Sequence, residues 1–407
     1  MSTKAHNTFT HTTTNTMTHT PRHVLPVIVL AQFAGTSLWF AINAVMPDLQ
    51  IQMGWPASDV GRLTSALQLG FIVGTLVFAV LAIADRFSSR RVFLVCSLAG
   101  ALCTVGALAQ VEEFSALLMW RASTGFFLAG IYPVGMKIAA QWFPKGLGVA
   151  LGWLVGAVVL GSASAHGIRA LSSQWPWSTV MLSVAGLAAA GGLMLYALIP
   201  EPPQKPKSAN QLEWRALASL WTNWRVRASA LGYFGHMWEL YTLWVLAPLI
   251  LSTRFEGTQL SIAACAVIGV GAVGCILGGF GAKRWGSAKV ATLQLSVSSL
   301  CCLLAPWLFS APLEIMMTWL LVWGITAAGD SPQFSTLTAS NAPPQAVGSI
   351  LTLTTCIGFG TSIVSIELFT SLATSHDLAM LLPWLGLGPL LGIWAMRPLW
   401  KKPAAPL

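Results

Sequence analysis

Long apolar stretches, separated by short polar connections, fill the chain from residue 24 almost to its end. About twelve of them reach the ~20 residues that an α-helix needs to cross the ~30 Å hydrocarbon core of a bilayer. Backbone polar groups in lipid must be paired within a helix or in a closed barrel, and the alternating pattern of barrel strands is absent. The pattern therefore predicts an all-α membrane protein with twelve transmembrane helices, at residues 25–46, 58–84, 92–110, 114–141, 147–166, 179–199, 227–251, 260–282, 288–309, 313–340, 346–372 and 378–396.

Polar stretches interrupt this pattern at both ends and in the middle of the chain. Residues 1–23 are rich in Thr and His, without the spacing of a metal site, and they predict a disordered cytoplasmic tail. The segment that follows Pro200 is proline-rich and charged, which is typical of a stiff linker. The expected organisation is a tail at 1–23, an N-terminal six-helix half at 24–200, a cytoplasmic linker at 201–225, a C-terminal six-helix half at 226–397 and a cytoplasmic tail at 398–407.

The composition excludes a soluble globular protein. Charged residues make up 9% of the chain and hydrophobic residues 55%, whereas roughly 25% charged residues are usual in soluble domains. The net charge of +9 does not indicate nucleic-acid binding, because the basic residues are sorted by membrane side. By the positive-inside rule they place both termini in the cytoplasm, with the chain as a multi-pass protein of the inner (plasma) membrane. The basic residues outside that distribution are Arg62, Arg121, Arg169 and Arg254.

Several chemistries find no support in the sequence. All seven cysteines lie in predicted spans, which favours small packing side chains over disulfides or a metal site. No Walker-type phosphate loop is present, so we expect no ATP hydrolysis and no cofactor. The clustered His and Asp motifs of membrane-embedded enzymes are also absent, so we expect no enzymatic activity.

The chain contains an internal repeat. The kink Ala-Gly-x-x-Pro that ends at Pro133 recurs at Pro332, 199 positions later. The basic loop around Arg86 recurs around Arg284, 198 positions later. Two unrelated features at nearly one offset predict two pseudo-symmetric six-helix halves, which is a known design of secondary transporters.

At these repeats the chain resembles the major facilitator superfamily, over essentially all of its length after residue 23. The family signature between helices 2 and 3 is Gly-x-Leu-Ala-Asp-Arg-x-Gly-Arg-Lys, and the matching residues here are Ala84, Asp85, Arg86 and Arg90. The departures are Leu81, Ser88 and Ser89. The second copy keeps Gly279, Ala282, Arg284 and Gly286, with Lys283 in place of the acid. The resemblance implies a monomer with a central cavity between helices 1, 4, 7 and 10.

Arg121 lies inside an apolar span, where a charge is costly unless it faces protein or water. It falls on the arginine of the family's helix 4 signature, and the resemblance implies a role in proton coupling or substrate binding. A structural role that holds helices together is the alternative. A pair between Arg121 and Asp330 of the related helix 10 would be an inter-half gate, a proton-linked pair or a plain structural ion pair.

The second half supplies the other buried charges. His236 and Glu239 are three residues apart and share a helix face, and a membrane-embedded carboxylate near a histidine is suited to a proton relay. Either residue could instead stabilise helix packing. Asp330 lies beside Pro332 in the second kink, and broken helices at mid-membrane commonly line binding sites. We predict that Arg121, Glu239 and Asp330 couple transport to protons.

Other polar and aromatic side chains on the cavity helices are candidates for substrate contact. The predicted substrate-binding residues are Asn43, Arg121, Tyr132, His236, Trp238, Tyr241 and Gln333. The predicted gating residues are Asp85, Arg86, Arg90, Arg284 and Glu367, of which Asp85 and Glu367 are more suited to structural support than to substrate contact. No metal site is expected.

The sequence thus predicts a proton-coupled secondary transporter that moves a small organic solute by alternating access. An anion is favoured because Arg121 and His236 offer cationic contacts. The expected partners are this small-molecule substrate, protons and the lipid bilayer. Two alternatives stay open: a proton-driven exporter of a metabolite or drug, and a membrane receptor without transport activity.

Overall fold

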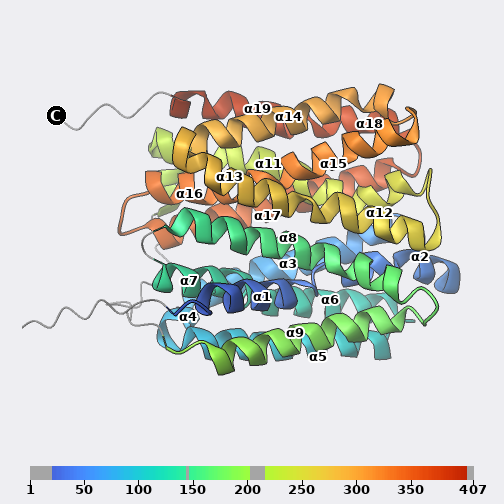
Figure 1. Cartoon of the computed structure of the whole chain (residues 1–407), viewed down its shortest axis with the longest axis horizontal. Coiled ribbons are helices and arrows are strands. Elements are labelled where there is room, and N and C mark those ends of the chain that lie inside the picture. The colour runs from blue at the N-terminus through green and yellow to red at the C-terminus, as the bar shows by residue number, and fades with distance from the viewer. Residues whose placement is uncertain (1–20, 144–145, 202–215, 401–407) are drawn as a thin grey trace, which may run out of the picture.

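The computed structural model describes residues 21–143, 146–201 and 216–400, and it contains helices but no strand within them (Figure 1). Most of the expected tails, at residues 1–20 and 401–407, and the centre of the expected linker, at 202–215, lie outside the described residues. The helices are α1 (Val24–Thr36), α2 (Ala41–Met53), α3 (Asp59–Val80), α4 (Ile83–Arg86), α5 (Ser89–Ala109), α6 (Phe114–Leu128), α7 (Tyr132–Trp142), α8 (Leu147–Leu171), α9 (Ser178–Leu198), α10 (Ala216–Thr222), α11 (Trp224–Leu251), α12 (Gly257–Gly269), α13 (Gly271–Trp285), α14 (Ser287–Leu308), α15 (Leu313–Gly329), α16 (Ser331–Asn341), α17 (Val347–Leu372), α18 (Leu378–Leu385), α19 (Leu387–Met396) and the 3-10 helix η1 (Arg397–Trp400).

These helices form the expected spans. Eleven helices or joined helix pairs in the described residues are long and apolar enough to cross a membrane. The remaining expected span, at 313–340, is present as α15 and α16, which Asp330 divides. The predicted class of an all-α membrane protein is therefore confirmed.

Several spans are broken, and the sequence pattern misplaced one of the boundaries. The first span was expected to end at Pro47, but α2 runs through Pro47 to Met53. A proline removes only one hydrogen bond from the ladder, and Asp48 just beyond it is held by Arg169 of α8 at 2.7 Å. The break in this span lies earlier, at residues 37–40 between α1 and α2.

The helices gather into two groups, with α1–α9 on the lower side and α11–α19 on the upper side of Figure 1. Helix α8 packs against α12 and α13, and α3 packs against α17, so two helix seams join the groups. Both ends of the described chain lie at the same end of the bundle, which we call the terminal end. The opposite end, where α2, α12 and α18 lie, is called the far end.

Glycines allow the closest of these contacts. A Cβ added at Gly125 of α6 would overlap the carbonyl oxygen of Leu67 in α3, and one at Gly70 would overlap the carbonyl of Ala122. In the seam between the groups, a Cβ at Gly152 of α8 would lie 3.1 Å from the carbonyl oxygen of Cys275. Backbones approach this closely only where side chains are missing, as is common between membrane helices.

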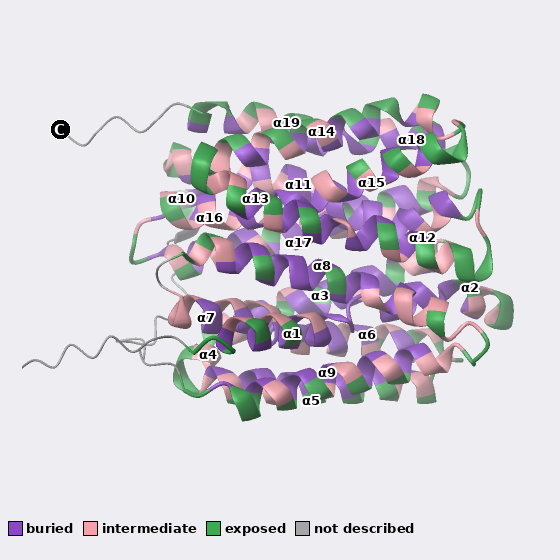
Figure 2. Cartoon of the chain, viewed as in Figure 1, coloured by how far each residue is buried: buried purple, intermediate pink, exposed green. Residues whose placement is uncertain are grey.

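The distribution of burial fits a protein that lipid surrounds (Figure 2). Buried residues face the centre of the bundle and include many polar side chains, among them Gln32, Asn43, Gln68 and Thr242. Large apolar side chains instead point outward, for example Leu102, Met119, Leu391 and Trp394. In a bilayer the outer surface needs no polar groups, whereas interior polar groups can pair with one another.

We predict that Gly125→Ala destabilises the protein by about 1–3 kcal/mol, because the added methyl group overpacks the contact between α6 and α3. The matched control is Gly186→Ala in α9, where the methyl group enters open space. Thermal unfolding in detergent should show a lower midpoint for the first variant only. Equal midpoints for both would contradict this close packing of the two backbones.

Candidate functional site

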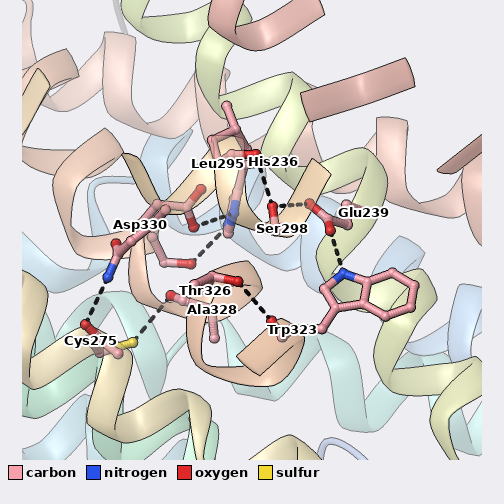
Figure 3. A network of polar contacts seen from close by, with 12 residues as sticks. His236, Glu239, Cys275, Leu295, Ser298, Trp323, Thr326, Ala328 and Asp330 are labelled. Carbon is pink, nitrogen blue, oxygen red and sulfur yellow. Dashed lines mark hydrogen bonds and ion pairs between the residues drawn. The ribbon is translucent and has the colours of Figure 1, made fainter. Parts of the chain in front are cut away.

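The break between α15 and α16 places a carboxylate in the middle of the bundle. Asp330 ends α15, precedes the first turn of α16 and is fully buried. Its Oδ1 lies 2.8 Å from Nδ1 of His236 in α11, and the other ring nitrogen, Nε2, lies 2.8 Å from Oγ of Ser331 (Figure 3). The histidine therefore bridges the carboxylate and the hydroxyl group at the helix break.

Glu239 lies about one helical turn further along α11 and faces a different set of partners. Its carboxylate accepts hydrogen bonds from Nε1 of Trp323 at 2.5 Å and from Oγ of Ser298 at 2.9 Å. The thiol of Cys302 lies 3.4 Å from Oε1. Glu239 is fully buried, and no cationic side chain in the described residues is within ion-pair distance of it. Neutral donors from α14 and α15 thus take the place of water around this carboxylate (Figure 3).

A small cavity lies between the two helix groups, beside the His236 ring. It holds about 30 Å³ of space, which is room for one or two water molecules. Its walls come from α7, α8, α11, α16 and α17, and the lining residues are Tyr132, Val155, Val158, Val159, Tyr233, His236, Met237, Leu240, Tyr241, Trp244, Ser331, Ser335 and Phe359. The space is too small for an organic solute, so this conformation is contracted around its centre.

Exposure along the cavity differs between its two ends. Tyr233, in the half of α11 nearer the terminal end, and Ser335 of α16 are only partly buried. Tyr241, Trp244 and Phe359 are almost fully buried. The cavity is therefore closed more completely on the side of the far end.

Aromatic rings from both helix groups make that closure. We call Trp39, Phe40, Tyr241, Trp244 and Phe359 the far-end plug. Trp39 stacks on Tyr241 with ring centroids 5.7 Å apart and lies 5.6 Å from Phe359. Phe40 lies 5.6 Å from Trp244 and 6.3 Å from Tyr241. Both Trp39 and Phe40 are fully buried, so the rings exclude solvent from this layer.

Arg121 does not line the cavity. Its guanidinium donates to the backbone carbonyl oxygens of Leu38 at 3.2 Å and Trp39 at 2.7 Å, within the break between α1 and α2. The side chain is 1% exposed. No ion pair between Arg121 and a carboxylate is present in the described part of the chain, Asp330 included.

The seven predicted substrate-binding residues occupy different places. Tyr132, His236 and Tyr241 line the cavity, and Ser331, next to the predicted Asp330, lies beside them. The amide of Asn43 donates to Thr64 Oγ1 at 2.9 Å within the first helix group. The structure brings together three of the predicted residues at the cavity and leaves Arg121, Asn43, Trp238 and Gln333 outside its lining.

Helical phase explains the position of Trp238. Two residues along a helix turn the side chain by about 200°, so Trp238 points away from His236. Its ring packs edge-on against Phe369 of α17, with centroids 6.1 Å apart. The residues that share the face of His236 follow at spacings of three and four, and they include Tyr233 and Trp244, which are not among the residues predicted from the sequence. That spacing was the signal that could have found them.

The predicted gating residues lie mainly at the terminal end. Lys137 of α7 contacts Asp85 at 2.5 Å and also donates to the carbonyl of Ala84. Arg90 pairs with Glu201 at 3.0 Å and donates to the carbonyl of Ile199, which ties the start of α5 to the end of α9. The other three are Arg86 and Arg284, which are exposed, and Glu367, which is partly buried in α17.

Comparisons with known proteins agree with the helical architecture. The family model described as Major Facilitator Superfamily matches residues 28–366. Over 132 residues the chain is 33% identical to a Haemophilus influenzae protein named "Putative metabolite transport protein", a match that spans 31% of this chain and only 30% of that protein's length.

Three solved structures share the fold. The human organic anion transporter MFSD10 has a TM-score of 0.71 and 16% identity, over 92% of this chain and 99% of that one. The proton:xylose symporter XylE has a TM-score of 0.73 and 13% identity, over 93% and 96%. The nucleoside transporter NupG has a TM-score of 0.70 and 16% identity, over 93% and 100%. At these identities the likeness establishes the fold alone.

The tie between Arg90 and Glu201 leads to a prediction on pH. Burial raises the pKa of the Glu201 carboxyl, but hydrogen bonds from Ser88 and Arg90 and the nearby charges of Arg90 and Arg91 outweigh it, so the pKa lies below the ordinary value of 4.5. A lowered pKa in the folded state adds stability above that value, and the gain is lost as the pH falls below it. Glu201→Gln should therefore lower the thermal midpoint at pH 7 and have less effect near pH 4.

The expected effect is at most ~1 kcal/mol, because the Glu201 side chain is 50% exposed and water screens the pair. Glu256→Gln at the far end is the matched control, since the carboxylate of Glu256 caps no backbone group of α12. A destabilisation by Glu201→Gln that is equally large at both pH values would show that charge has no part in this contact.

Proposed function

Because the chain belongs to the Major Facilitator Superfamily, we propose that it is a proton-coupled secondary transporter of a small organic solute. Transport of a small solute, and not catalysis, is the activity of this family and of the relatives named above. Coupling to protons, alternating access, the preference for an anion and the direction of transport are parts of the proposal. Contacts among the described residues support the proposed proton coupling and the preference for an anion.

The contact between His236 and Asp330 carries the proposal. A buried carboxylate and an imidazole ring 2.8 Å apart can share or exchange a proton, and the ring also reaches the Ser331 hydroxyl at the cavity wall. Proton binding here changes the charge of the helix break that faces the cavity. A solute in the cavity and a proton on this pair would thus influence each other's binding directly.

Glu239 is the second proposed proton-binding group. It lies on α11 about one turn from His236 and is fully buried among neutral hydrogen-bond donors. An unpaired charge in a dry interior is costly, and binding of a proton removes that charge. Arg121 was expected to join this set, but its hydrogen bonds go to backbone carbonyls, so the proposal gives coupling first to Asp330 and then to Glu239.

The lining of the cavity bears on the class of solute. His236 is the single side chain among the described lining residues that can become a cation, so an anion would be held by its protonated ring. Hydroxyl groups of Tyr132, Tyr241 and Ser331 would orient the solute through hydrogen bonds. We propose proton symport of a small organic anion, because binding of the anion and of the proton then reinforce each other.

The aromatic lining supports a second candidate. Tyr233, Tyr241, Trp244 and Phe359 offer ring faces that would also suit an apolar aromatic compound. Such a compound would bind less well beside a protonated, charged ring than beside a neutral one, so solute and proton would oppose each other, as in a proton-driven exporter. The two candidates differ in sign: acid on the solute's side favours binding in symport and opposes it in export.

The proposed orientation places the terminal end in the cytoplasm. Basic residues of the described chain concentrate there, which the positive-inside rule associates with the cytoplasmic side. They are Arg22, Arg86, Arg90, Arg91, Lys137, Arg225, Arg227, Lys283, Arg284, Lys289 and Arg397. With this orientation the far-end plug closes the outer side, and the conformation described here is contracted with its outer side shut.

We predict that Asp330→Asn reduces solute accumulation driven by a pH gradient at least about tenfold, while exchange of solute across the membrane continues. The amide keeps the size of the carboxyl group but cannot bind a proton at physiological pH. Purified protein in liposomes, screened with radiolabelled carboxylates, sugars, amines and aromatic compounds, provides both measurements. Exchange without net accumulation would also exclude a receptor that does not transport.

Glu239→Gln tests the second group in the same assay. If Glu239 carries a coupled proton, this variant loses accumulation as well; if it only stabilises α14 and α15, accumulation persists and the thermal midpoint falls. Glu314→Gln, at the exposed start of α15, is the control for loss of a carboxylate on the same span. Undiminished gradient-driven accumulation in Asp330→Asn would contradict the proposed coupling.

A further inference from the structure

The break in the first span leaves two backbone carbonyls without a helical partner. In an unbroken helix Leu38 and Trp39 would accept from the N–H groups four residues later. Here no such bonds form within the described backbone, because α1 ends at Thr36 and α2 begins at Ala41. Arg121 donates to both carbonyls, at 3.2 Å and 2.7 Å. Unpaired carbonyls at membrane depth are costly, so the arginine stabilises the broken form of the span.

The same break delivers the aromatic residues that shut the cavity. Trp39 and Phe40 belong to the four residues between α1 and α2, and their rings cross to the second helix group. There they contact Tyr241, Trp244 and Phe359, all of which line the cavity. Arg121 thus holds the backbone of Leu38 and Trp39, immediately before Phe40, and so positions the rings that the first helix group contributes to the far-end plug.

The helix that carries Arg121 is closely packed against its neighbour. Its helix α6 packs against α3 through Gly125 and Gly70, where the two backbones touch. Helix α3 in turn contacts α17 of the other group, where Ser362 donates to Gln68 at 2.8 Å. The guanidinium therefore extends from a closely packed helix pair of the first group to the break in the first span.

We propose that Arg121 is a positioning residue of the outer gate: it fixes the break in the first span so that Trp39 and Phe40 can seal the cavity against the far end. The inference rests on the proposed alternating access, because it describes how one side is kept closed. It assigns Arg121 neither substrate contact nor proton transfer. According to this inference, the gate depends on hydrogen bonds to uncharged backbone carbonyls and not on the protonation of Asp330.

The test measures entry to the cavity from the far end. Ser335→Cys places a thiol on the cavity wall, in a full-length chain whose seven native cysteines are replaced by serine or alanine. A membrane-impermeant maleimide is added to the far-end side of oriented vesicles, without solute or pH gradient. Arg121→Gln should raise the labelling rate by at least about tenfold, since a hydrogen bond to a charged donor stabilises by that factor or more.

The plug residue Trp39 provides the decisive comparison. Trp39→Ala should open the same route. The double variant with Arg121→Gln should label no faster than Trp39→Ala alone, because both substitutions disrupt the same outer gate and their effects then do not add. Arg121→Lys should give an intermediate rate, since lysine keeps the charge but not the two-pronged donor geometry. Each variant is first checked for a monodisperse elution profile, and Trp39→Ala keeps the test informative if Arg121→Gln does not fold.

Transport assays then separate this role from coupling. Arg121→Gln should change how fast solute passes without shifting the pH at which transport is half-maximal, whereas Asp330→Asn should remove that pH dependence. Unchanged far-end labelling together with a shifted pH profile would overturn the inference and assign Arg121 to the proton pathway. Because labelling needs neither solute nor protons, it can succeed even if the proposed proton coupling fails.

Discussion

The need to pair every polar group inside an apolar slab governs this structure. A helix meets that need by itself, but a broken helix does not, and at least two spans of this chain are broken near the middle of the membrane. The two central breaks are stabilised by opposite charges. Arg121 supplies hydrogen-bond donors to the carbonyls of Leu38 and Trp39, whereas Asp330 sits within its own break and faces His236. Two of the buried charges, Arg121 and Asp330, are therefore bonded or placed where a helix ladder stops.

This arrangement divides the two helix groups by chemistry. The central buried charge of the first group, Arg121, is bonded to backbone, which has no titratable state. The buried charges of the second group, Asp330 and Glu239, contact groups with exchangeable protons, including His236, Ser298 and Cys302. The two helix groups thus differ in their polar centres, although the sequence repeat predicts one framework for both. The proposed division of labour, with gating in the first half and proton binding in the second, rests on that difference.

Much of the fold could be predicted from the sequence, because apolar length and positive charge directly reflect the thickness and sidedness of a membrane. The second break could also be predicted, since Pro332 marks it. The first break, at residues 37–40, contains no proline. Pro47, where the sequence pattern placed the end of the span, lies inside the continuous helix α2. The partners of Arg121 could consequently not be predicted from the sequence. They are backbone carbonyl oxygens, which can accept from a side chain only where the helix is broken.

The candidate site shows the same limit. Asp330 and His236 stood out as rare charges, and they lie together. Among nineteen tryptophans, however, residue type alone could not separate Trp238 from Trp244. The two side chains differ in the direction in which they point around the axis of α11. That direction shows which one lines the cavity only when another residue of the cavity face is known. His236 would have provided that reference.

The seam between α8 and the helices α12 and α13 has a mechanical consequence. It runs nearly the whole length of α8, and glycines such as Gly152 and Gly156 bring backbone against backbone, with few side chains to interlock. Surfaces of that kind can roll over one another without rotamer changes or loss of hydrogen bonds. In the proposed alternating access this seam would be the fulcrum, and the two helix groups would tilt about it while the parts furthest from it travel furthest.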